Sequence, residues 1–77
     1  MSLKEQYITD ITNGCAYLDA QVEAKTTEKT PYGTWKIQET VDGIKYQLGL
    51  DEVKNSSEDL SAFNTSISNA EAYIATL

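Results

Sequence analysis

The sequence predicts an α+β fold in which two antiparallel amphipathic helices pack on a two-stranded antiparallel β-hairpin. Three observations support this prediction. Apolar residues recur every three or four positions in the first third of the chain, alternate with polar residues in the middle, and return to helical spacing near the end. Because 77 residues suffice for one domain, we expect a single unit over 1–77, in the order helix, hairpin, helix.

The first helix is expected over about 3–24. Ser2, followed three positions later by Glu5, fits a capping box at its start. The apolar positions 8, 11, 15, 18 and 22 are spaced three, four, three and four, which places them on one helical face. Gly14 lies inside this pattern. It is either a tolerated weak point, the commoner case, or a place where another backbone approaches closely.

The middle of the chain carries the hairpin signal. We interpret 25–33, which contains the only proline, as a loop, and we expect the hairpin over about 34–51 with its turn at Asp42-Gly43. A two-residue turn pairs positions 41 with 44, 39 with 46, 37 with 48 and 35 with 50. Seven of those eight residues are apolar, and Glu39 is the exception, near the turn and opposite Tyr46. The apolar face would include Trp35 and would pack against the helices.

The last helix is expected over about 57–76. Residues 51–55 are interpreted as a connector, and Ser56 or Ser57 offers an N-cap, with Glu58 and Asp59 in the first turn. Apolar residues then recur at helical spacing at positions 60, 63, 67, 70, 74 and 77. This stripe predicts an amphipathic helix that pairs with the first one over the hairpin.

Composition argues against catalysis and cofactors. The sequence has no histidine, so the commonest general base is absent and zinc and iron sites of the usual kind are excluded, and we expect no enzyme activity, no metal and no cofactor. The one cysteine, Cys15, falls on the apolar stripe and is expected to be a buried small hydrophobe. A single thiol, no membrane-length apolar stretch and an N-terminus without a signal-peptide pattern predict a cytoplasmic protein that does not bind membranes.

Charge favours a protein partner. Twelve acidic residues face six basic ones, all lysine, for a net charge of −6. This balance disfavours direct nucleic-acid binding and suits a basic protein partner, although acidic charge also simply keeps proteins soluble. The open edges of a hairpin allow a homodimer as well. Tyrosines outside the core stripes, a charge on the hairpin face and amides on the last helix suggest contact residues. The candidate partner-binding residues are Tyr17, Tyr32, Glu39, Asn64, Asn69 and Tyr73.

In size, charge and predicted topology the chain resembles small phage proteins, both head-completion proteins and small acidic inhibitors of host defence. No sequence motif carries this resemblance. It implies a non-catalytic inhibitor, of a phage or mobile element, that occludes a basic site on a nucleic-acid-handling complex in the host cytoplasm. The alternative is a structural or assembly subunit, suggested by the small core and the two heptad-like stripes.

Overall fold

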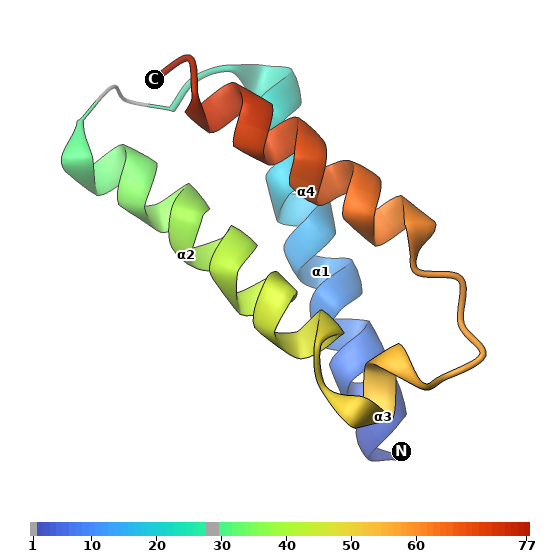
Figure 1. Cartoon of the computed structure of the whole chain (residues 1–77). Coiled ribbons are helices and arrows are strands. Elements are labelled where there is room, and N and C mark those ends of the chain that lie inside the picture. The colour runs from blue at the N-terminus through green and yellow to red at the C-terminus, as the bar shows by residue number, and fades with distance from the viewer. Residues whose placement is uncertain (1, 28–29) are drawn as a thin grey trace.

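The chain folds as a helical bundle. The structure, a computed structural model, describes residues 2–27 and 30–77, and these form four α-helices and no β-strand. α1 spans Leu3–Ala24, α2 spans Pro31–Leu48, α3 spans Asp51–Lys54 and α4 spans Ser61–Ile74 (Figure 1). α2 runs antiparallel to both α1 and α4, and the short α3 closes one end of the bundle. Over the described residues the predicted α+β fold is therefore wrong.

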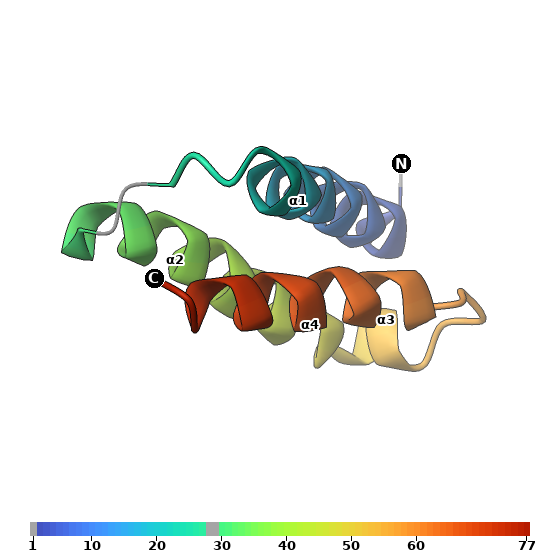
Figure 2. The same ribbon diagram turned by 90° about the horizontal axis from the view of Figure 1, so that it is seen from above.

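The three long helices enclose one apolar core. α1 lies across the layer formed by α2 and α4, as the view from above shows (Figure 2). All four helices contribute to the core, and the molecule is 38 Å long and about half as wide. The buried apolar residues are Ile11, Cys15, Leu18, Ile37, Val41, Ile44, Val53, Ile67 and Ala70.

α1 has the bounds that its sequence pattern predicts. Ser2 is its N-cap, and the Ser2 hydroxyl accepts a hydrogen bond from the Glu5 backbone N–H at 3.2 Å. Lys25 follows the helix as its C-cap, its φ of 54° lies in the left-handed region, and its N–H donates to the Gln21 carbonyl. The predicted apolar stripe faces the core, and the Cys15 thiol is buried there as expected.

α2 replaces the predicted hairpin, and its start explains why. Thr30 is the N-cap, its hydroxyl accepts from the Gly33 N–H at 3.2 Å, and Pro31 occupies the first turn. A threonine cap followed by proline is a helix-start signal, because proline needs no hydrogen bond there and its φ already suits a helix. The loop predicted over 25–33 is therefore wrong for Thr30 and Pro31, which begin α2.

The residues of the predicted turn lie inside α2. A type I′ turn needs positive φ at both central residues, but no described glycine has a positive φ, so Gly43 is an ordinary helical residue. Positions 37, 41, 44 and 48 are spaced four, three and four, and this stripe faces the core. Trp35 and Tyr46 were assigned to the apolar face of the hairpin, yet both are exposed. Burial against α1 and α4 thus outweighs the alternating pattern.

The connection to the last helix also differs from the prediction. The expected connector contains α3, whose Val53 is fully buried beneath the bundle. The last helix starts at Ser61, later than expected, and neither Ser56 nor Ser57 caps it. Instead the Asp59 carboxylate accepts hydrogen bonds from the Ser61 N–H at 3.0 Å and from the Ser61 hydroxyl at 2.7 Å. These bonds satisfy a donor at the start of α4.

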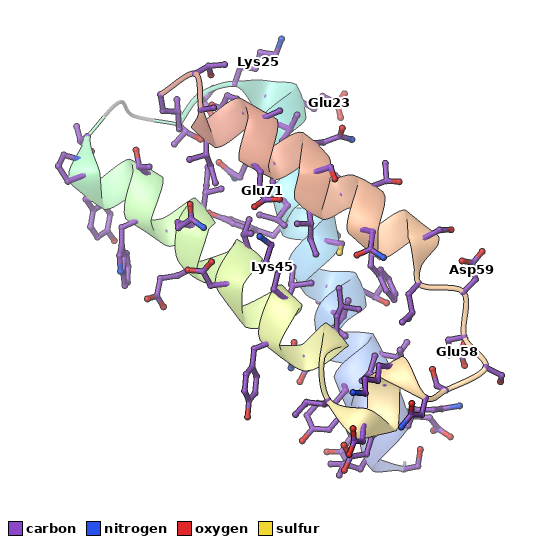
Figure 3. All side chains as sticks on the ribbon, viewed as in Figure 1. Glu23, Lys25, Lys45, Glu58, Asp59 and Glu71 are labelled. Atoms are coloured by element: carbon purple, nitrogen blue, oxygen red, sulfur yellow. The ribbon has the colours of Figure 1, made fainter. Side chains whose placement is uncertain are left out.

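Polar contacts between helices complete the bundle. The Ser66 hydroxyl donates to the Asp19 carboxylate at 3.2 Å, joining α4 to α1. The ammonium of Lys45 on α2 lies 2.6 Å from the carboxylate of Glu71 on α4, and the two side chains point toward each other in Figure 3. Because both are nearly half exposed, we expect this ion pair to contribute less than about 1 kcal/mol.

Candidate protein-binding surface

One helix face combines exposed aromatic rings with carboxylates. On α2, positions 32, 35, 39, 42 and 46 are spaced three, four, three and four, so their side chains share the side opposite the core stripe. We call Tyr32, Trp35, Glu39, Asp42 and Tyr46 the α2 outer face. All five are exposed, and the exposed fractions of residues Tyr32, Trp35 and Tyr46 are 71%, 54% and 71%.

This concentration of aromatic surface is confined to α2. The only other large apolar side chain exposed among the described residues is Leu3, at the start of α1. The outer surfaces of α1 and α4 carry small and polar residues instead. Three aromatic rings that point away from the core add nothing to its packing. Large rings with polar atoms are the residue type enriched at protein interfaces.

The two rings at the start of α2 are stacked. The ring centroids of Tyr32 and Trp35 lie 6.1 Å apart with an interplanar angle of 28°. Stacking restricts the rotamers of both side chains, so less conformational freedom remains to be lost on binding. The pair is therefore a preorganised aromatic platform.

The acidic members of the face follow on the next turns. Glu39 is exposed, as expected, although it lies on a helix and not beside a hairpin tip. The Asp42 carboxylate accepts a hydrogen bond from the Gln38 side-chain amide at 3.0 Å, a spacing of four residues that holds it on the helix surface. Next to it, a Cβ atom built on Gly43 would meet no atom within 4 Å. This part of the face is thus acidic and sterically open.

A shallow cleft adjoins the face between α1 and α2. It encloses about 260 Å³, and its lining includes Tyr17, Gln21, Thr27, Tyr32 and Lys36. The Lys36 ammonium lies 5.6 Å from the centroid of the Tyr17 ring, a cation–π contact across the two helices. The cleft places two candidate tyrosines, Tyr17 and Tyr32, on one surface with Glu39 further along α2.

The other candidate residues lie elsewhere. Asn69 borders two neighbouring hollows of about 570 and 360 Å³ along α1 and α4, and Tyr73 borders the smaller one. The Tyr73 hydroxyl accepts a hydrogen bond from the Thr27 N–H at 3.3 Å, so this tyrosine holds the segment after α1. Asn64 is exposed and donates its side-chain amide to the Leu60 carbonyl at 3.2 Å. The six candidates therefore do not form one site.

Sequence reasoning missed three members of the α2 outer face. The alternating pattern predicts Trp35 and Tyr46 in the core and Asp42 in a turn. The signal was nevertheless present: the five positions from Tyr32 to Tyr46 keep the helical spacing of three and four. Two interleaved stripes, one aliphatic and one aromatic–acidic, are typical of a helix with two different faces.

Two observations concern metal binding and nucleophilic chemistry among the described residues. Among 2–27 and 30–77, no three Cys, Asp or Glu side chains come together as metal ligands would. Burial raises the pKa of the Cys15 thiol, an effect that a hydrogen bond from Ser66 opposes and the nearby Asp19 charge reinforces. A raised pKa keeps this thiol protonated, which is the less nucleophilic form.

Comparisons add no functional assignment. Searches against protein-family models, curated proteins and solved structures find no match to this chain. Within the part of the chain that the structure describes, no helix combines the length and apolar character needed to cross a bilayer.

Proposed function

We propose that this chain is a non-catalytic protein-binding module that engages a basic protein through the α2 outer face. The observation behind the proposal is the exposure of Tyr32, Trp35 and Tyr46 on the side of α2 that faces away from the core. Glu39 and Asp42 lie between these rings, and the whole chain carries a charge of −6. Aromatic anchors with acidic neighbours suit a partner surface rich in lysine or arginine.

A more specific form of this proposal is an inhibitor, of the kind encoded by phages and mobile elements, that covers a basic nucleic-acid-binding site. An excess of acidic over basic residues mimics the charge of a nucleic-acid backbone and speeds encounter with such a site. Adding the chain should then displace nucleic acid from its captured partner. If the partner still binds nucleic acid at saturating amounts of the chain, the inhibitor proposal is wrong, but the more general proposal of a protein-binding module is not affected.

The test of the binding module compares two triple-serine variants of the full chain. Tyr32→Ser/Trp35→Ser/Tyr46→Ser removes the aromatic rings of the α2 outer face, whereas Thr9→Ser/Asn13→Ser/Ala16→Ser changes exposed positions of α1. Circular dichroism first establishes that both remain helical. We expect the immobilised wild type and the α1 variant to retain one basic protein from lysate, and the α2 variant to lose it. Equal retention by all three would disprove a role for this face.

A further inference from the structure

We infer that the partner element recognised by the α2 outer face is an arginine-bearing α-helix, with a guanidinium stacked on Trp35 and paired with Glu39. This inference rests on the proposed function, because it specifies the chemistry of the partner that the same face accepts. Four observations carry it: the arrangement of ring and carboxylate, the engagement of the two α2 lysines, the spacing of the face, and the charge of the chain.

Trp35 and Glu39 are placed for a planar cation. They are four residues apart on α2, so their Cβ atoms lie about 5–6 Å from each other on one side of the helix. Indole is the best cation–π ring among the side chains. A guanidinium is flat, weakly hydrated and able to give a carboxylate two parallel hydrogen bonds, so it can use the ring and the carboxylate together. A lysine ammonium is compact and strongly hydrated and cannot use both as well.

Neither lysine of α2 supplies this cation. α2 carries two lysines, and both are engaged away from its outer face. The Lys36 ammonium lies over the Tyr17 ring at 5.6 Å, and the Lys45 ammonium is 2.6 Å from the Glu71 carboxylate. Trp35 and Glu39 therefore have no cation supplied by their own helix.

The spacing of the face fits a helix. From Tyr32 to Tyr46 the face covers 14 intervals, which is about 21 Å of helix at 1.5 Å per residue. A second helix that lies along α2 can contact these residues on every turn, because its own side chains repeat at the same spacing of three and four. The side chains of an extended strand repeat every two residues and do not match this spacing. Gly43, which has no side chain and open space around it, lets a partner helix approach the α2 backbone beside Asp42.

A second copy of this chain does not fit the face. In a two-fold dimer through the α2 outer face, Glu39 and Asp42 of one copy would approach the same carboxylates of the other. Each copy also carries a net charge of −6 and contains no arginine. Like charges brought together oppose association, so the face selects a basic partner over itself.

Trp35 supplies the readout, because it is the only tryptophan in the chain and lies within the face. The full chain is titrated with three synthetic peptides while tryptophan emission is followed. The first is an alanine- and glutamine-based helix with arginines one heptad apart. The second has lysine at every arginine position. The third keeps the arginines of the first, but its central alanines are replaced by proline so that it cannot form a helix. None of the peptides contains tryptophan, so every signal comes from Trp35.

We expect the arginine helix to change the Trp35 emission saturably and to bind about tenfold more tightly than the lysine or the proline peptide. Glu39→Gln should reduce the affinity for the arginine helix to that for the lysine helix. Glu52→Gln, which removes an exposed carboxylate of α3 outside the face, is the matched control and should leave the affinity unchanged.

Equal affinity for arginine and lysine helices, equal affinity for the proline peptide, or an unchanged Trp35 emission would each overturn the inference. These outcomes are separate from the fate of the proposed function. If the serine variant of the α2 outer face loses its partner but the peptides show no arginine preference, the binding module stands and the arginine-helix inference fails. If that variant keeps its partner, the proposed function fails as well.

Discussion

Gly14 of α1 and Ile44 of α2 pack so closely that a Cβ atom on residue 14 would lie 2.9 Å from Ile44 Cδ1 and 3.1 Å from Cγ1. The glycine is therefore where a side chain of the neighbouring helix fills the space that its own side chain would need. Of the two interpretations of Gly14, the close approach is the one that the packing favours, although a side chain and not a backbone makes it.

We predict that Gly14→Ala destabilises the wild-type bundle by up to about 2 kcal/mol. Alanine gains about 1 kcal/mol of helix propensity, but overpacking against Ile44 costs about 1–3 kcal/mol. In an Ile44→Val background, which lacks Cδ1, the same substitution should be neutral or stabilising. Chemical denaturation of the four proteins measures this coupling, and strictly additive effects would contradict the close contact.

The Asp59 carboxylate is predicted to make stability depend on acid pH. Hydrogen bonds from the Ser61 backbone N–H, and secondly from its hydroxyl, lower the pKa of Asp59 in the folded state. A lowered folded-state pKa gives stability that is present above the unfolded-state pKa, near 4, and is lost as pH falls through the folded value. The melting temperature, measured between about pH 2 and 7, should therefore fall toward acid pH. The part of this fall that is due to Asp59 should be absent in Asp59→Asn.

Substitutions at Asp59 separate its charge from its role as a hydrogen-bond acceptor. At neutral pH, Asp59→Ala should lower the melting temperature more than Asp59→Asn, because the asparagine oxygen still accepts from the Ser61 N–H. Asp10→Asn, which changes an exposed carboxylate on α1, is the control. A pH dependence that survives in Asp59→Asn would show that other carboxylates produce it.

The buried thiol of Cys15 is predicted to reduce stability at alkaline pH. Burial, together with the charge of Asp19, raises the pKa of this thiol in the folded state, and the Ser66 hydrogen bond only partly offsets the rise. A raised pKa gives stability that is complete below the unfolded-state pKa, about 8.5, and is lost as pH rises toward the folded value, because the unfolded chain releases its proton first.

Measurement of this effect needs a cysteine-free reference, since lysines and tyrosines also titrate at high pH. The free energy of unfolding of the wild type should fall more steeply above about pH 8.5 than that of Cys15→Ala. The difference between the two curves isolates the thiol. Parallel curves would mean that the thiol has the same pKa in both states.

The Tyr73 hydroxyl is predicted to fasten the segment that follows α1. It accepts the Thr27 N–H at 3.3 Å, so Tyr73→Phe should cost about 0.5–1.5 kcal/mol and speed hydrogen exchange at the Thr27 amide. Tyr17→Phe is the matched control, because no described hydrogen bond involves the Tyr17 hydroxyl. Unchanged exchange at Thr27 in Tyr73→Phe would show that the bond does not hold this segment.

α1 and α4 could be predicted because the apolar residues of each follow only the helical spacing of three and four. In α1, Ile11, Cys15 and Leu18 can share a face only in a helix, and in α4 Ile67 and Ala70 continue a similar stripe. The middle of the chain carries two periods at once. Ile37, Val41 and Ile44 fit a helix, but Trp35, Ile37 and Val41 also alternate, and Asp42-Gly43 adds a turn signal.

Only tertiary packing decides between the two periods. An isolated hairpin has one apolar face to cover, whereas as a helix this segment buries its aliphatic stripe between α1 and α4. The same choice determines the candidate site. Tyr32 and Glu39 were identified as contact residues, but Trp35 and Tyr46 join them on one face only when the segment is helical. The predicted hairpin therefore separates residues that the helix brings together on the α2 outer face.

The hydrogen bond between Asp19 and Ser66 joins residues 47 positions apart, and it marks an interface between the first and last long helices. The entropy of closing so long a loop must be lost before these contacts form. Folding is therefore slower than it would be if only residues near in sequence had to pair. Ile11 and Leu18 are fully buried in the core to which α4 contributes Ile67 and Ala70, so we expect them to be only partly covered until α4 has been made. A chain released before α4 is made would therefore leave this core open and prone to aggregation.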